Sequence, residues 1–363
     1  MSDAPSETGP HPRLHTRFCD LVGCRYPIVQ TGMGWVSGAN LTAATSAAGG
    51  IGILAAVTMT PDQLVDAVRG VKERTDAPFG VNFRADQPDL VERLRFVTGE
   101  GVRLVSFAGA PTRDAISMVH DAGGVVVPTV GARRHAEKMV EWGVDAVIAQ
   151  GGEGGGHTGS VPTSLLLPQV AEAVGASIPV LGAGGFHSGA GLIAALAYGA
   201  DGIAMGTRFL LTAESRVPDD IKSRYTAASV FDTVVTTALD GAPQRVIRTE
   251  TVDGLEKAPT VLKLPAALRR ALTFRKQTGT PLGDLVKEGL AMRRSQDLTW
   301  AQLAMAANAP MLIKAALVDG DPTVGVLPTG QVTGVIDELP SVASLIEEIV
   351  ADATATLDRL VSS

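Results

Sequence analysis

The chain has 363 residues, of which 41 are glycine and only 4% are aromatic, and its formal net charge is −7. This length accommodates one large domain or two ordinary ones, and the composition is typical of parallel α/β proteins packed with small aliphatic side chains. The acidic balance excludes a general nucleic-acid binder, and no apolar run reaches the ~18–20 residues that a membrane span needs.

The first 19 residues are polar and lack the apolar core of a signal peptide, so we interpret residues 1–19 as a loose tail. Cys19 and Cys24 are the only cysteines, too few for a disulfide framework or a thiolate metal site. These features predict a cytoplasmic protein with no membrane partner. The acidic, helix-coated chain is also compatible with a homodimer.

From residue 20 onward, short β-branched apolar runs alternate with amphipathic segments. Strands are predicted at residues 27–30, 50–55, 79–83, 103–107, 125–129, 145–149, 178–182 and 202–205. Helices are predicted between them, at residues 39–48, from 61 onward, 88–97, 112–122, 132–142, 165–174 and 189–198. Thr60 followed by Pro61 is a typical helix start. Strand-then-helix units repeated every ~25 residues predict an α/β fold, a (β/α)8 TIM barrel over residues 20–212.

Beyond residue 212 this alternation stops. Helical patterns cover residues 215–225, 262–276 and 298–317, and residues 234–237 and 246–248 are compatible with paired strands. We therefore predict a mostly helical lid over residues 213–329 that covers the barrel mouth. Residues 330–363 are predicted to form a Gly-Gln loop and a closing helix at 341–360.

The lid segment also reverses the charge of the chain. Residues 245–294 hold 11 Lys and Arg against 5 Asp and Glu, a net +6, which leaves −13 for the rest. Such a cluster is either a solvated helix face or a binding site for an anionic substrate.

Enzymes with this barrel work at the carboxyl ends of the strands, so residues that follow the predicted strands should share one rim. In this chain they are mostly glycines and neutral polar groups, with few carboxylates: residues 30–34, Asn82, Ser106, Thr129, residues 150–160, residues 182–185, Gly206 and Thr207.

Two glycine turns fall where such barrels bind phosphate. Gly182-Ala-Gly-Gly185 follows the seventh predicted strand, and Met205-Gly-Thr207 follows the eighth. Exposed backbone N–H groups at tight turns hold an anion well. Ordinary turns are the alternative, but two clusters at these two strands favour a phosphate site.

The loop after the sixth predicted strand, Gln150-Gly-Gly-Glu-Gly-Gly-Gly-His157-Thr-Gly-Ser160, carries a single imidazole among six glycines. The glycines let a ligand lie against bare backbone, and His157 is the group nearby that can transfer a proton near neutral pH. A flexible surface loop with an incidental histidine is the alternative.

Metal and nucleophile chemistry find little support. The other histidines show no HxH or HExxH spacing, no carboxylate pair adjoins His157, and no Gly-x-Ser-x-Gly turn or rim cysteine is present. A phosphate cradle with one histidine therefore indicates that a bound cofactor performs the difficult chemical step and that the protein mainly transfers a proton.

These motifs resemble the nitronate monooxygenase (2-nitropropane dioxygenase-like) family of FMN-dependent TIM barrels, which also contains NAD(P)H-dependent reductases of enoyl thioesters. The resemblance covers residues 20–212 and Gly330-Gln331, and rests on the rim motifs above together with the stretch Gly202-Ile-Ala-Met-Gly-Thr-Arg-Phe209. The His157 loop, with Ala306-Ala-Asn-Ala-Pro-Met-Leu-Ile-Lys314, is more similar to an actinobacterial branch linked to degradation of steroid C and D rings as CoA thioesters.

The resemblance implies bound FMN and a set of contact residues for it. His157 is the implied general base or acid, without a metal. The implied cofactor contacts are Gly32, Met33, Asn82, Gln150, Gly156, Gly184, Gly185, Gly206, Thr207 and Gln331. For a CoA thioester, the implied phosphate contacts are Arg269, Arg270 and Arg275, with Lys263 and Lys276 nearby.

Two enzymatic activities share every rim residue. The first prediction is oxidation of a small nitronate with O₂, and the alternative is an FMN oxidoreductase of a CoA or acyl-carrier thioester that uses NADH or NADPH. An isomerase or an IMP-dehydrogenase-like enzyme is a further alternative, but the latter needs a cysteine that the loop after the sixth strand lacks. A non-enzymatic binding protein would not require a histidine amid bare backbone on that rim.

Overall fold

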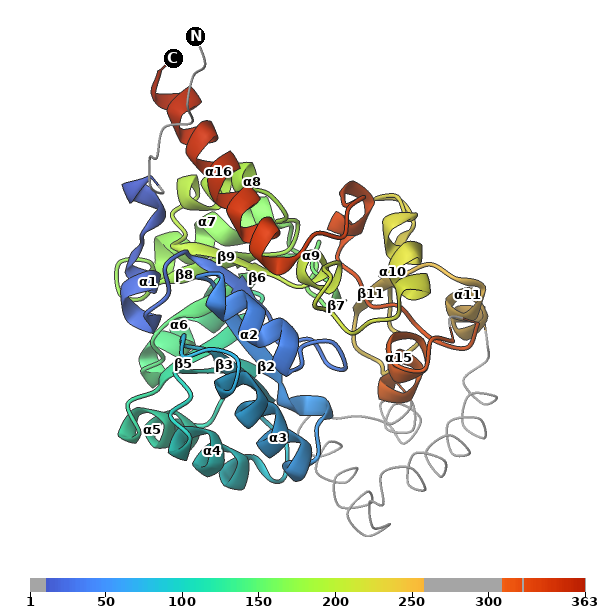
Figure 1. Ribbon diagram of the computed structural model, residues 1–363, viewed down its shortest axis with the longest axis horizontal. Helices are drawn as coiled ribbons and strands as arrows, with labels where there is room; N and C mark the ends of the chain where they lie inside the picture. The colour runs from blue at the N-terminus through green and yellow to red at the C-terminus, as the bar shows by residue number, and fades with distance from the viewer. Residues whose placement is uncertain (1–10, 258–308, 322, 363) are drawn as a thin grey trace.

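The computed structural model describes residues 11–257, 309–321 and 323–362. Its centre is a closed barrel of parallel strands in the order β1-β2-β3-β4-β5-β6-β8-β9 (Figure 1). The strands are Ile28–Gln30, Ile51–Ala55, Gly80–Arg84, Leu104–Ala108, Val125–Val130, Val147–Gln150, Val180–Ala183 and Gly202–Met205. The predicted (β/α)8 barrel is thereby confirmed.

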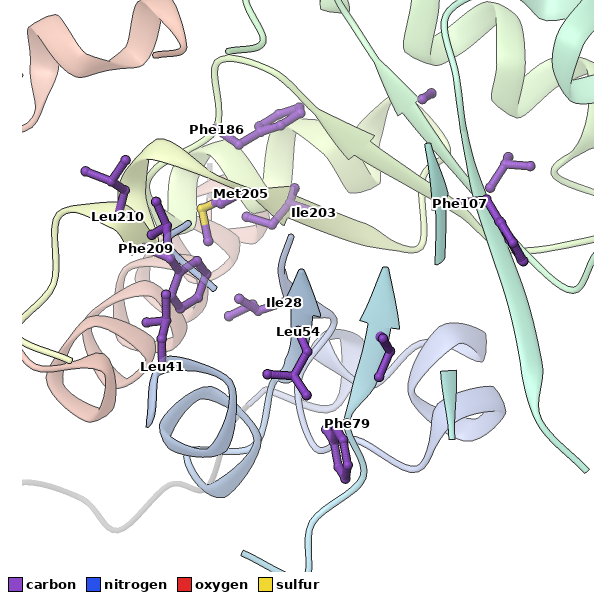
Figure 2. Packing of buried hydrophobic residues seen from close by; sticks show 14 of the residues in the cluster. Ile28, Leu41, Leu54, Phe79, Phe107, Phe186, Ile203, Met205, Phe209 and Leu210 are labelled. Carbon is purple, nitrogen blue, oxygen red and sulfur yellow. The ribbon is translucent and has the colours of Figure 1, made fainter. Parts of the chain in front are cut away.

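Helices follow the strands and coat the barrel. They are α2 (Ala39–Ala47), α3 (Pro61–Lys72), α4 (Leu90–Gly99), α5 (Arg113–Asp121), α6 (Arg133–Trp142), α7 (Thr163–Val174), α8 (Gly189–Ala197) and the short α9 (Thr207–Leu210). The predicted start of α3 is confirmed, because the Thr60 hydroxyl accepts from Gln63 N while the Gln63 side chain accepts from Thr60 N. Figure 2 shows Ile28, Leu41 and Phe209 within the apolar layer between strands and helices.

The alternation of side chains along each strand divides the core into two layers. Outward-facing residues such as Val81 and Phe83 pack under the helices, whereas inward-facing residues such as Val29, Ile51 and Leu104 fill the barrel interior. The lower part of the barrel is therefore solid apolar packing.

A short helix, α1 (Arg17–Val22), extends this packing at the amino end of the barrel. Phe18, Cys19 and Val22 are buried with the inward-facing strand residues, and Arg17 bonds to Asp201 at 3.0 Å. The chain is in contact with the barrel even before α1, because Leu14 is buried in the layer between strands and helices and the Thr16 hydroxyl donates to Asp201 O at 2.6 Å. A one-turn 3₁₀ helix, Pro12–Leu14, precedes it.

The described part of residues 213–340, which we call the cap, lies beside the carboxyl end of the barrel (Figure 1). It contains α10 (Asp219–Thr226), β10 (Thr233–Thr236), β11 (Gln244–Ile247), α11 (Glu250–Lys257), α15 (Ala309–Leu317) and the 3₁₀ helix η3 (Gln331–Val335). Leu239, Val246, Val252, Leu312 and Val326 form a small apolar core of its own. The predicted strand pair is confirmed as an antiparallel hairpin.

The cap is joined to the barrel by backbone pairing. β11 pairs antiparallel with β7 (Gly156–His157), the two-residue strand in the glycine-rich loop after β6. The last helix, α16 (Val342–Val361), instead packs along α8 and α2 on the outside of the barrel. The predicted helix at 262–276 and the basic residues in it lie outside the described residues.

Candidate functional site

A cavity of about 1070 Å³ opens at the carboxyl end of the barrel, between the rim and the cap. Its floor consists of the upper inward-facing side chains of the strands: Ile53, Asn82, Ser106, Thr129, Ile148, Gln150, Ala183 and Ala204. Because the apolar layer below these residues is fully packed, a ligand enters only from the rim side.

Backbone donors without a protein acceptor lie on one side of this cavity. Gly184 and Gly185 have φ of +97° and +81°, which favours glycine, and they turn the chain sharply after β8. Within the described residues, the N–H groups of Gly185, Gly206 and Thr207 have no acceptor in the protein. The Thr207 hydroxyl accepts from Gly330 N at 2.8 Å, so its own proton remains for an acceptor in the cavity.

One buried cation, Arg208, and the ring of His187 lie behind this turn. Arg208 is buried, and its guanidinium donates to the backbone oxygens of Leu211 and Glu338, both at 2.8 Å, while its Nε has no partner. Burial lowers the pKa of Arg208 and of His187. The buried guanidinium of Arg208, with its unpartnered Nε, gives this side of the cavity a positive charge and an unpaired donor, as an anion requires.

The loop after β1 presents its backbone to the cavity next to the turn after β9, since a Cβ on Gly206 would meet Met33 Sδ at 3.4 Å. A Cβ atom on Gly32 would collide with the Asn82 side chain, so this approach requires glycine. Ser37 fixes the loop, because its hydroxyl accepts from Met33 N at 2.9 Å and from Gln30 Nε2 at 2.9 Å. Asn82 Nδ2 donates to Ser106 at 2.8 Å, which holds that amide in the cavity floor.

The glycine-rich loop is fixed from both ends. The Glu153 carboxylate accepts from Thr163 N at 2.9 Å and from the Thr163 hydroxyl at 2.7 Å, which caps the start of α7. A Cβ on Gly155 would lie 2.5 Å from Gly330 N, so the cap loop packs directly on the glycine backbone. Gln150 Nε2 donates to His157 O at 2.8 Å.

His157 meets two side chains of the cap hairpin. Its Nε2 lies 2.7 Å from Asp240 Oδ2 and 3.2 Å from Gln244 Nε2. Gln244 Nε2 also donates to Asp240 Oδ2 at 2.5 Å. The histidine side chain is 66% exposed, whereas Asp240 is only 12% exposed. A carboxylate held beside an accessible imidazole is an arrangement that can transfer protons.

The structure brings most of the predicted site residues together. Lining the one cavity are Gly32, Met33, Asn82, Gln150, Gly156, His157, Gly184, Gly185, Gly206 and Thr207. Gln331 does not line it, since its amide donates to Val230 O at 3.4 Å; its neighbours Gly330 and Val332 line the cavity instead. The predicted substrate residues Arg269, Arg270 and Arg275 lie outside the described residues.

Two residues that contact His157 were not predicted from the sequence. Asp240 and Gln244 lie in and after the turn of the cap hairpin, more than 80 positions beyond His157. The dipeptide Asp240-Gly241 between two β-branched runs is a hairpin signal that locates the turn, but it does not tell which loop the turn contacts.

The part of the chain that the structure describes was also searched for metal sites and membrane-spanning helices. No group of three or more His, Cys, Asp or Glu side chains there is placed to hold a metal ion. No helix among those residues has both the length and the apolar character to cross a membrane.

Comparison with known proteins gives matches along nearly the whole chain. The sequence model of a family described as nitronate monooxygenase matches residues 15–352. A relative from Mycobacterium tuberculosis, 54% identical over 346 residues, is named (3aS,4S,5R,7aS)-5-hydroxy-7a-methyl-1-oxo-octahydro-1H-indene-4-carboxyl-CoA dehydrogenase. That match covers 95% of this chain and 98% of the relative.

Two solved structures have the same architecture. FabK from Thermotoga maritima superposes with a TM-score of 0.76 at 33% identity, covering 96% of this chain and 98% of that one. A nitroalkane oxidase from Streptomyces ansochromogenes gives a TM-score of 0.73 at 29% identity, covering 94% and 99%. These similarities extend over the barrel and the cap together.

Proposed function

The chain belongs to the nitronate monooxygenase family and is an oxidoreductase, and from this premise we propose that it is an FMN-dependent dehydrogenase of a fused-ring acyl-CoA thioester. The relative that is 54% identical is named for a reaction on a thioester of this kind. Nitronate oxidation is the first prediction from the sequence, and the thioester reaction is the second. We reverse that order, because the relatives named for nitronate oxidation are less similar to this chain.

The unpaired donors of the rim fit the phosphate of FMN. The N–H groups of Gly185, Gly206 and Thr207 and the Thr207 hydroxyl face one region of the cavity, and Arg208 adds positive charge behind it. We assign the flavin ring to the surface formed by the Gly32-Met33 backbone, with the amides of Asn82 and Gln150 in reach. When bound, FMN supplies a two-electron acceptor.

The observation that carries the substrate assignment is an apolar wall of the cavity. It consists of Leu210 from the barrel and Ala309, Pro310, Ile313 and Leu317 from α15. On α15, Ala309, Ile313 and Leu317 are spaced four residues apart. They share one helix face and form a continuous surface. In a cavity of about 1070 Å³, this wall suits a fused aliphatic ring better than a small nitronate.

His157 is the proton acceptor in this proposal. A thioester carbonyl acidifies the adjacent C–H bond, and the imidazole accepts that proton; FMN would supply the acceptor for the hydride of the next carbon. The product is an α,β-unsaturated thioester. Net loss of two hydrogens from the substrate requires a final electron acceptor, for which O₂, NAD⁺ and NADP⁺ are the choices to compare.

Purified protein tests the proposal directly. We expect a yellow protein that releases FMN on denaturation and that converts a hydrindane carboxyl-CoA thioester to a product two mass units lighter. Nuclear magnetic resonance of the product distinguishes a C=C bond beside the thioester from a ketone at a ring hydroxyl. No turnover of ring thioesters with any of the three acceptors would contradict the proposal.

Nitronate oxidation is the second candidate function. It is favoured by the family model and by the architecture shared with the nitroalkane oxidase. Rapid oxygen consumption with propyl nitronate, together with no reaction of the thioester, would select it.

A further inference from the structure

We propose that Asp240 and Gln244 are positioning residues that hold the His157 imidazole with Nε2–H on the Asp240 carboxylate and Nδ1 free to accept the substrate proton. The inference deepens the proposed function and rests on it for the identity of the proton donor. It assigns part of the catalytic machinery to the cap rather than to the barrel.

The backbone of His157 is held without help from these side chains. β7 pairs with β11 in the register His157 to Gln244, and Thr158 N donates to Pro243 O at 3.1 Å. Gln150 Nε2 donates to His157 O at 2.8 Å from the barrel side. The contact with Asp240 is therefore not needed to place the loop, and it acts on the orientation of the ring.

The Asp240 carboxylate has a defined set of partners. Its Oδ1 accepts from Ala242 N at 3.1 Å, and its Oδ2 accepts from Gln244 Nε2 at 2.5 Å. Among the described residues, His157 is the only basic side chain within ion-pairing distance of this carboxylate. A largely buried carboxylate without an arginine or lysine gains its counter-ion when the imidazole accepts a proton.

The partners of the ring decide which nitrogen is basic. Since the carboxylate lies 2.7 Å from Nε2, the neutral ring carries its proton there, and Nδ1 keeps the lone pair. Nδ1 has no partner in the described part of the chain, and His157 lines the cavity. The Gln244 amide donates to the same carboxylate oxygen and restricts its rotation.

The proton balance of the step is simple. The bond between the substrate carbon and its proton breaks, and a new N–H bond forms at Nδ1. The electron pair of that C–H bond becomes part of the new C=C bond as the neighbouring carbon loses a hydride, for which FMN would supply the two-electron acceptor. The positive charge that forms on the ring faces Asp240. Because the histidine side chain is 66% exposed, the proton then passes to solvent.

Alternatively, the contact of His157 with Asp240 is an exposed ion pair that contributes little energy, as many surface ion pairs do. The two possibilities predict different protonation of the His157 ring nitrogens, which can be measured without catalytic turnover. A carboxylate-bound Nε2 proton exchanges slowly with water and is observed in a proton–nitrogen correlation spectrum, with Nδ1 unprotonated.

The experiment uses the FMN-loaded full chain labelled with nitrogen-15 histidine, with His157→Gln to assign the signal. In the unmodified chain we expect the Nε2 proton signal of His157. In Asp240→Asn we expect its loss, a fall in kcat of roughly 10²-fold, and an unchanged KM and FMN affinity. Asp240→Glu should restore part of kcat, and Gln244→Leu should cause a smaller loss.

Asp253→Asn is the matched control, because Asp253 is an ion-paired cap aspartate, 2.9 Å from Arg248, outside the cavity lining. It should leave the spectrum and kcat unchanged. Wild-type kcat in Asp240→Asn, or a His157 ring protonated on Nδ1 in the unmodified chain, would overturn the inference. The spectrum requires no substrate, so it tests this assignment even if the thioester reaction fails.

Discussion

The Thr207 hydroxyl accepts a hydrogen bond of 2.8 Å from the backbone N–H of Gly330, a residue 123 positions later in the chain. The bond joins the turn after the last barrel strand to the loop that leads out of the cap. It also directs the hydroxyl proton of Thr207 away from the protein and into the cavity. The phosphate site that we propose is thus completed by two segments that only the folded chain brings together.

The phosphate site can be tested with two glycines in the same strained conformation. Gly185 has φ +81° and Gly123 has φ +76°, and a Cβ atom would meet nothing closer than 3.9 Å at the first and nothing within 4 Å at the second. Replacement of either by alanine should cost ~1 kcal/mol of stability through the backbone alone. Only Gly185 lines the cavity.

We therefore expect Gly185→Ala to weaken FMN binding by more than tenfold in a fluorescence titration, with Gly123→Ala close to the unmodified chain. Equal FMN affinity in the two variants would place the phosphate elsewhere on the rim.

The role of His157 is tested by His157→Gln. Loss of a general base typically costs ~10²–10⁴-fold in rate, so we expect that loss in kcat with FMN still bound. His120→Gln is the control, because His120 also pairs with an aspartate, Asp145, at 2.8 Å but lies outside the cavity lining. Stopped-flow reduction of the bound flavin by substrate gives the rate of the affected step. Unchanged reduction in His157→Gln would assign proton transfer to another group.

The apolar wall predicts a selective loss of large substrates. In Ile313→Trp the indole would extend from α15 into the cavity, so turnover of a ring thioester should fall at least tenfold while a small nitronate is affected little. Val318→Trp adds the same bulk at an exposed position just after α15, outside the cavity lining, and should change neither activity. Equal losses for both substrates in Ile313→Trp would point to general damage of the cavity.

The barrel was predictable because its signal is local. Most strands are short apolar runs, several of them followed by glycine, and the helices between them are amphipathic. Residues such as Asn82 and Gln150 could therefore be assigned to the rim from their positions alone. Helix α1 was missed because only its apolar face, with Phe18 and Val22, distinguishes it from the polar residues before it.

The residues that contact His157 in the glycine-rich loop were not predictable in this way. Asp240 reaches His157 through an antiparallel pairing between two loops far apart in sequence, and no periodicity encodes that pairing. The position of Gln331 shows a related limit. Its place after Gly330 is near the cavity, but the backbone turn of η3 directs its amide to Val230 O.

The pH dependence of stability should carry opposite contributions from two histidines. Burial, as the main cause, lowers the pKa of His187 below its ordinary value of 6.5, so the unfolded chain binds more protons there than the folded chain. Folding is therefore disfavoured by His187 as the pH falls through 6.5. The hydrogen bond that the His15 ring donates to Asp20 raises the pKa of His15. Its stabilising contribution is present below 6.5 and is lost as the pH rises through the folded value. We expect His187→Asn to flatten the loss of unfolding free energy between about pH 7 and pH 5, and His15→Asn to steepen it slightly, since His15 is exposed.

Urea unfolding at several pH values measures both effects. The flavin-free protein is used, because a bound phosphate near Gly185 would add its own charge beside His187. A steeper acid loss in His187→Asn would mean that the folded state favours the protonated ring.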